Sequence, residues 1–335
     1  MAQICKLRIR CGQQDDLTTD PQYFIAANTL NRRSVGAALV RVAGEIEGYI
    51  LFYEYYFFGI RLGLARLGDH LGEGFVVGPE PLRTQLVHLA ANALLKSRRF
   101  HGITISIRAP VDDCIRTMGP EGKHAIFSRR EIQYKLPLAE TYQAMLASFG
   151  QRTRRSLAGK RRQLEQSMNV VFEPSLNPET ALEAMLSLRT KSLPDRDAAF
   201  FHARRSLRLQ NPEFFCMGMR TPQGDWLSIL SGWRRNRVTY IDLQMNDMNY
   251  KKESLSAVMR AFTLEYEIAR RQELLYFVGG CSLLLRRYCN TGEECTDIFL
   301  SLPGLRTQLF RAFVPPAIMK SILERKNPTF SQIQA

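Results

Sequence analysis

The polar side chains best suited to chemistry lie on a strand-like segment from Val238 to Gln244. Alternation along a strand would place Tyr240, Asp242 and Gln244 on one face and apolar side chains on the other. A carboxylate there could act as a general base toward an incoming amine or hydroxyl, and a tyrosine could hold or protonate a leaving group. An ordinary strand with one polar face would show the same pattern without any reaction. We therefore predict Asp242 and Tyr240 as candidate catalytic residues.

The segment that follows could bind a phosphate group. It is polar, carries Lys251 and Lys252, and leads into a helical pattern from Leu255 to Arg271. The amides at a helix N-terminus point outward and the helix dipole favours negative charge, which is the geometry that a coenzyme A pyrophosphate needs. The alternative is a solvated loop with Ser254 as an ordinary N-cap, and Glu253 partly offsets the positive charge. The predicted cofactor-binding residues are Gln244, Asn246, Lys251, Lys252, Ser254 and Ser256.

Residues 151–166, QRTRRSLAGKRRQLEQ, form the most basic segment of the sequence. Leu157 and Leu164 supply an apolar stripe, so the pattern predicts a helix with one buried side. Glu165 is the only acid in this segment, so one face must be strongly positive. Such a face could bind an anionic acceptor or nucleic acid, or serve solubility, but it lacks the aromatic side chains that stack on single-stranded bases. The cations are Arg152, Arg154, Arg155, Lys160, Arg161 and Arg162.

Two further residues are candidates on weaker grounds. His202 lies in the aromatic segment 200–205 and could serve as a base, although a histidine in such a segment is more often packed. Asp69 lies on a loop bounded by Gly68 and Gly74, which could contact a substrate or be only a turn.

Composition limits the class of protein. The chain has 335 residues, of which 45% are hydrophobic and 23% charged, so we expect a folded protein of one large domain or two ordinary ones. The formal net charge of +14 attracts phosphates, nucleic acid, acidic glycans or anionic lipid without choosing among them. The 7 cysteines form no C-x-x-C pair, which predicts reduced thiols, a cytoplasmic location and no metal site.

Motifs of several enzyme classes are missing from the sequence. It has no G-x-S-x-G, P-loop, H-E-x-x-H or dinucleotide-binding fingerprint, which argues against a serine hydrolase, an NTPase, a zinc protease and a dehydrogenase. It also has no apolar run long enough for a signal peptide or a membrane span, so we expect no stable membrane insertion.

The elements that would position these residues follow one order in each half: helix, antiparallel strands, helix, strand. The second half begins after a break at 136–140 and is the fuller copy. We therefore predict an α/β (α+β) fold with mixed, mostly antiparallel sheets flanked by helices. The predicted elements of the second half are helices at 141–148, 151–166, 177–190, 200–209 and 255–271 and strands at 169–173, 214–220, 226–234, 238–244 and 274–278.

This order resembles the GNAT-fold acyltransferases of the FemAB and CelD type. The matching features are a leader at Tyr134–Leu138, the basic helix, the strands 214–244, and a helix and strand that end at Gly279–Gly280, with Arg286 and Tyr288 beyond. The resemblance covers about residues 20–300. It implies two tandem GNAT-like modules, a degenerate one over 1–135 and an acyltransferase module over 136–310, followed by a short helix and tail over 311–335.

The resemblance also implies a function. Such a protein would move an acyl group from acyl-CoA (acetyl-CoA or longer) or aminoacyl-tRNA to an amine or hydroxyl of an acceptor such as an envelope sugar, an amino sugar or a peptide, without a metal. The sequence departs from the family pattern at Ser254–Ser256, where relatives carry glycine, and at Phe277–Val278, where they often carry Asp. An inactive scaffold that binds nucleic acid or a protein partner through the basic helix is the alternative. The implied substrate-binding residues are Arg154, Arg155, Asp69, Arg286 and Tyr288.

Overall fold

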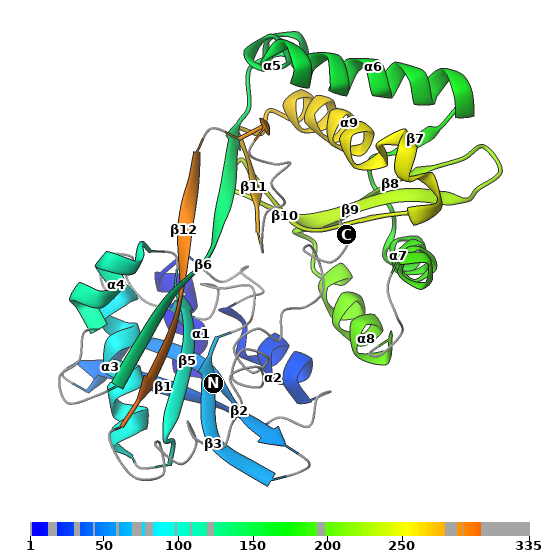
Figure 1. Ribbon diagram of the computed structural model, residues 1–335. Helices are drawn as coiled ribbons and strands as arrows, with labels where there is room; N and C mark the ends of the chain where they lie inside the picture. The colour runs from blue at the N-terminus through cyan, green and yellow to red at the C-terminus, as the bar shows by residue number, and fades with distance from the viewer. Residues whose placement is uncertain are drawn as a thin grey trace. The chain divides into compact units, whose positions relative to one another are not determined.

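Each half of the chain repeats one succession of elements: antiparallel strands, a helix, and a strand that runs parallel to the last of them (Figure 1). In the first half these are β1 (Val35–Val42), β2 (Glu45–Phe57), β3 (Ile60–Leu67), α3 (Arg83–Lys96) and β5 (Gly102–Ile107). In the second half they are β8 (Phe214–Arg220), β9 (Trp226–Arg235), β10 (Val238–Asn246), α9 (Leu255–Ala269) and β11 (Leu274–Phe277). The predicted mixed sheets flanked by helices are confirmed.

The computed structural model describes residues 2–12, 19–29, 34–42, 44–57, 60–68, 76–77, 83–97, 99–107, 109–118, 124–192, 198–278, 287–289 and 291–302. The predicted tail at 311–335 lies outside them. No helix in these ranges is both long enough and apolar enough to cross a membrane.

Among the described residues, unit 1 comprises those up to Ile132 and those from Glu293 to Leu302. Its strands follow the order β1-β2-β3-β5-β12-β6, and β4 pairs with β2. The core lies between this sheet and α3, where Leu95, Phe100 and Ile103 are fully buried. The remaining elements of the unit are α1 (Ala2–Arg10), α2 (Pro21–Thr29), β4 (Val76–Val77), α4 (Val111–Met118), the first part of β6 (His124–Pro137) and β12 (Thr291–Ser301).

Unit 2 runs from Gln133 to Gly292, and its strands follow the order β6-β11-β10-β9-β8-β7. Helices α7 and α8 pack on one face of this sheet, whereas α9 packs on β9 and β10 and also on α6. Because α9 has neighbours on both sides, apolar residues all round it are buried, including Val258, Met259 and Leu264. The other elements are α5 (Tyr142–Ser148), α6 (Gln151–Met168), β7 (Val171–Glu173), α7 (Pro178–Ser192), α8 (Ala198–Leu209) and the 3-10 helix η4 (Met248–Glu253).

Local capping explains where several helices of unit 2 begin. The Thr141 hydroxyl accepts a hydrogen bond from the amide of Ala144, and the Asn177 side chain accepts one from the amide of Thr180. Pro178 follows as the first residue of α7, where its missing N–H is no loss. These caps fix the helices that hold the sheet residues described below.

Candidate active site in unit 2

Strands β10 and β11 pair over only part of their length. Their parallel ladder ends at Ile241 and Phe277, and the last bond between these segments is donated by the Val278 amide to the Ile241 carbonyl at 2.8 Å. Strand β10 nevertheless continues to Asn246. Beyond Ile241 its edge is therefore not paired with the described part of β11. Such an edge offers backbone donors and acceptors to an extended ligand.

A β-bulge at Asp242 adjoins the end of this ladder. Against β9, Ile241 is opposite Gly232 and Leu243 is opposite Ser231, so Asp242 is an extra residue on β10. A Cβ atom at position 232 would lie 1.7 Å from the Tyr240 carbonyl oxygen, which only glycine avoids. A bulge redirects the side chains that follow it.

The bulge overturns the predicted alternation. The Gln244 amide donates to the Ser256 carbonyl at 3.2 Å, and the Thr239 hydroxyl donates to Glu267, so both side chains lie on the α9 side of the sheet. Asp242 instead contacts α8 on the other side. The prediction that Gln244 shares a face with Asp242 is therefore wrong, because the extra residue shifts the two-residue period by one.

Asp242 is bound on both carboxylate oxygens. Oδ2 accepts hydrogen bonds from Arg205, at 2.8 Å, and from Arg208, and Oδ1 accepts one from the Ser231 hydroxyl at 3.1 Å. Asp242 is 4% exposed and both arginines are buried. A carboxylate with its oxygens already occupied favours a role in holding α8 against the bulge over the predicted role of a free general base.

Tyr240 belongs to an aromatic row across three strands. Its ring stacks on Trp233 of β9 at 5.1 Å between centroids and lies 5.4 Å from Tyr276 of β11. The Tyr276 hydroxyl donates to the Gln133 side chain at 2.6 Å, and the Lys135 ammonium lies 5.5 Å from the Tyr276 ring centroid. This row forms a partly buried surface beside the Asp242 bulge.

His202 lies on α8 one turn before Arg205, and its side chain is exposed. His202 thus shares a helix with Arg205 and Arg208, which bind Asp242. Because the ring is open to solvent, it could exchange a proton with an acceptor.

The segment predicted to bind a phosphate is folded into η4. The Asp247 side chain accepts from the Asn249 amide at 2.9 Å, and Ser254 takes the left-handed conformation with φ 56°. Ser254 occupies the N-cap position of α9, as predicted, but its hydroxyl makes no capping hydrogen bond with the described residues. Oε2 of Glu253 is buried and finds no hydrogen-bond partner among them.

These features do not fit a coenzyme A pyrophosphate. Glu253 directly precedes the N-cap residue of α9, so it adds a negative charge near the helix end where an anionic ligand would bind. Ser254 adds a Cβ atom at a left-handed position where glycine would allow close approach. The acids Asp247 and Glu253 also cancel the formal charge of Lys251 and Lys252. No metal-binding group of acids, cysteines or histidines occurs in the part of the chain that the structure describes.

The other predicted residues are dispersed over unit 2. The Asn246 side chain accepts from the Ser228 hydroxyl at 2.8 Å, and Lys252 is exposed. Tyr288 packs edge-to-face on Phe149, and the guanidinium of buried Arg260 lies 5.5 Å from its ring centroid. Arg154 and Arg155 are exposed on α6. Asp69, Arg286 and the side chain of Lys251 lie outside the described residues.

The buried ion pairs that hold the elements of this unit together were not predicted from the sequence. Glu267 is 0% exposed and binds Arg234 through both oxygens as well as the Thr239 hydroxyl. Arg205 and Arg208, spaced three apart on α8, could have been found, because cations on the sheet-facing side of a helix need an acid, and Asp242 lies on a buried strand of that sheet.

Comparison with known proteins identifies the fold. Neither a scan against protein-family models nor a search of curated proteins gives a match. Among solved structures, FemX superposes with a TM-score of 0.60 at 11% identity over 90% of this chain and 98% of its own. The L-PGS of Bacillus licheniformis gives 0.55 at 10% identity over 91% and 96%. A tandem GNAT protein from the clavulanic acid biosynthesis pathway gives 0.51 at 11% identity over 88% and 95%. The predicted resemblance is confirmed at the level of fold: the chain has two tandem GNAT-like modules.

Proposed function

We propose that unit 2 is an acyltransferase, which moves an acyl or aminoacyl group from an activated ester or thioester to an amine or hydroxyl. The observation that carries this proposal is the parting of β10 from β11 directly beside the bulge at Asp242. It occurs in a fold shared with FemX, L-PGS and a tandem GNAT protein. We take the reaction class, acyl transfer, from this likeness of fold.

The edge of β10 beyond the end of its ladder with the described part of β11 would position the donor. Residues beyond Ile241 present backbone amides and carbonyls that could bind an extended donor as an added strand. An amide on this edge would then polarise the acyl carbonyl as its oxygen gains negative charge. The acceptor nitrogen or oxygen attacks the carbonyl carbon, its proton leaves, and the alcohol or thiol of the donor departs. Positioning would supply most of the rate.

Each predicted catalytic residue has a distinct part in this proposal. Asp242 is a positioning residue, since its carboxylate ties Arg205 and Arg208 to the bulge. His202 is the candidate that takes the acceptor proton, because its ring is exposed on the same helix. Tyr240 and its aromatic neighbours provide a surface for the acceptor, which we propose to be an envelope sugar, an amino sugar or a peptide amine.

Several activated compounds could carry the acyl group to this site. Since η4 and Glu253 do not fit a pyrophosphate, no step of the mechanism depends on coenzyme A. Acetyl-CoA, long-chain acyl-CoA and aminoacyl-tRNA are all activated donors, and an experiment must separate them. Calorimetric titration of the nucleic-acid-free protein with both thioesters tests the first two.

We expect neither thioester to bind strongly, and Glu253→Gln to improve binding by removing a repelling charge. If the wild-type protein binds either thioester and Lys251→Ala/Lys252→Ala weakens it, the pyrophosphate site predicted from the sequence is supported instead. Transfer itself is tested by mass spectrometry of an amino sugar and a peptide amine after incubation with each donor in turn. If no donor gives a product with either acceptor, the acyltransferase proposal is overturned.

A further inference from the structure

The outer face of α6 carries arginines without ion-pair partners. Arg152, Arg154, Arg155 and Arg162 are exposed, and none forms a salt bridge with any residue that the structure describes. Arg161 differs, because it binds Glu165 at 2.9 Å and Glu265 at 2.6 Å. The acids near α6 therefore neutralise the inward cation and leave the outward ones open.

Helix geometry gathers these side chains in one line. At about 100° per residue, Arg152, Arg155 and Arg162 fall within a sector of about 80°, opposite the buried Leu157 and Leu164. The rise of about 1.5 Å per residue spreads them over roughly 15 Å along the helix. The other residues in this sector or at its borders are uncharged: Gln151, Gly159, Gln163 and Gln166. The result is a straight positive ridge.

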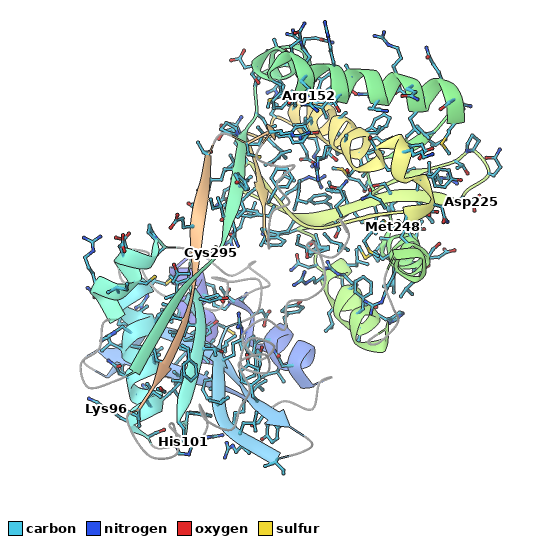
Figure 2. The ribbon with its side chains drawn as sticks, in the orientation of Figure 1. Lys96, His101, Arg152, Asp225, Met248 and Cys295 are labelled. Carbon is cyan, nitrogen blue, oxygen red and sulfur yellow. The ribbon has the colours of Figure 1, made fainter. Side chains whose placement is uncertain are left out.

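The helix is fixed along its length. Its apolar side is buried, and the Arg161 guanidinium lies 4.2 Å from the Phe262 ring centroid of α9. Figure 1 shows α6 lying beside α9, and Figure 2 shows side chains of α6 projecting from the side away from α9. A helix docked in this way can present Arg152, Arg155 and Arg162 to a flat surface at once.

We propose that the arginine ridge of α6 docks the protein on an anionic lipid bilayer surface. The ridge has no aromatic side chain to stack on bases and no large apolar side chain to insert into the hydrocarbon, so the contact is electrostatic and peripheral. The negative potential of an anionic leaflet attracts each nearby cation, and the formal net charge of +14 assists the approach. This inference is independent of the transfer reaction and says where the protein works.

The test is cosedimentation of the full chain with vesicles made of equal parts phosphatidylcholine and phosphatidylglycerol. We expect binding at low salt that is reversed by added salt, and none to vesicles of phosphatidylcholine alone. The variant Arg152→Gln/Arg155→Gln/Arg162→Gln should lower the partition coefficient of the protein between vesicles and water about a hundredfold. This estimate adds the typical attraction of one cation to such a surface three times, once for each arginine removed. Circular dichroism checks that the variant remains folded.

The matched control is Lys6→Gln/Arg41→Gln/Lys96→Gln, which removes the same formal charge from exposed positions in unit 1. Its partition coefficient should stay within a fewfold of the wild type. Equal loss in the two variants would overturn the proposal in favour of a general charge effect, and so would absence of wild-type binding. A short duplex RNA that binds through the same arginines more tightly than the vesicles, at the same salt, would overturn it in favour of nucleic acid.

Discussion

The carbonyl oxygen of Tyr240 occupies the space into which any side chain on Gly232 would extend: a Cβ there would lie 1.7 Å from it. This contact belongs to the bulge that sets Asp242 apart from its neighbours on β10. The position of a candidate site residue thus depends on a glycine of the adjacent strand.

Substitution of this glycine should destabilise unit 2. Gly232→Ala forces backbone atoms apart, so we expect a loss at or above the upper end of the usual overpacking cost of about 1–3 kcal/mol. Denaturant unfolding measures the change in free energy. The control is Gly159→Ala on α6, where a Cβ meets nothing within 4 Å and the helix should gain up to about 1 kcal/mol. Equal stability of the two variants would contradict the bulge argument.

Removal of the Asp242 carboxylate should destabilise unit 2, because it takes a buried acceptor from Arg205 and Arg208. We expect Asp242→Ala to cost about 3–5 kcal/mol, because Arg205 and Arg208 lose their shared acceptor. Asp242→Asn should cost less, since the amide oxygen can still accept hydrogen bonds. Thermal and urea unfolding measure both changes, and Asp225→Asn at an exposed turn should stay within about 0.5 kcal/mol of the wild type. A stable Asp242→Ala protein would show that the arginines are held by other contacts.

Two buried thiols should resist alkylation in the native protein. Burial raises the pKa of Cys216 and of Cys289 to about 12, so very little thiolate is present near pH 8. Exposed Cys5 should react with iodoacetamide in the folded protein, whereas Cys216 and Cys289 should react only after unfolding. Peptide mass spectrometry measures the modification at each site. Native labelling of Cys289 at the rate of Cys5 would contradict its burial.

The same thiols make stability fall in alkali. Their ordinary pKa is 9.0, so the unfolded chain ionises them above that pH while the folded chain keeps them protonated up to about 12. The free energy of unfolding should therefore decrease across this interval. Replacing both by alanine should reduce the slope, and an unchanged slope would assign it to other groups.

Glu54 of unit 1 should make the free energy of unfolding depend on pH in the acidic range. Burial alone would raise the pKa of its carboxyl, but hydrogen bonds and charges from Arg61 and Arg99 outweigh burial, and the pKa lies below its ordinary value of 4.5. A lowered folded pKa stabilises the fold above pH 4.5, and this contribution is lost as pH falls. The stability difference between wild type and Glu54→Gln should therefore stay constant from neutral pH down to about pH 5 and shrink as pH falls below 4.5. Glu45→Gln, on the exposed start of the same strand, is the control.

Much of the fold could be predicted because periodicity marks long elements. The helix predicted from Leu255 to Arg271 is α9, which ends at Ala269, and the strand predicted over 238–244 continues to Asn246. The basic segment 151–166 is α6, with Leu157 and Leu164 buried as expected. Helices α1, α2 and α4 were not predicted, because short elements carry too few repeats to separate their period from chance. Strand β12 was not predicted either, although it has 11 residues.

The site was harder to predict because it depends on irregular backbone. The bulge at Asp242 is one extra residue that leaves no signal in the alternation around it, so Gln244 was assigned to the wrong face. The 3-10 helix η4 replaced the expected polar loop, since Asp247 caps its first turn. Polar and charged residues alone predict which groups are available for a site, whereas the pairing of strands decides which of them meet.

Strand β12 lies between β5 and β6 in the sheet of unit 1, yet residues 133–290 of unit 2 precede it in the chain. A ribosome therefore delivers this whole segment before the strand that completes the first sheet. Until β12 has been made, the edge of β5 at Thr104 and Ser106 lacks the strand that pairs with it in the folded protein. The sheet that contains the earliest strands of this protein is thus completed only after most of unit 2 has been synthesised.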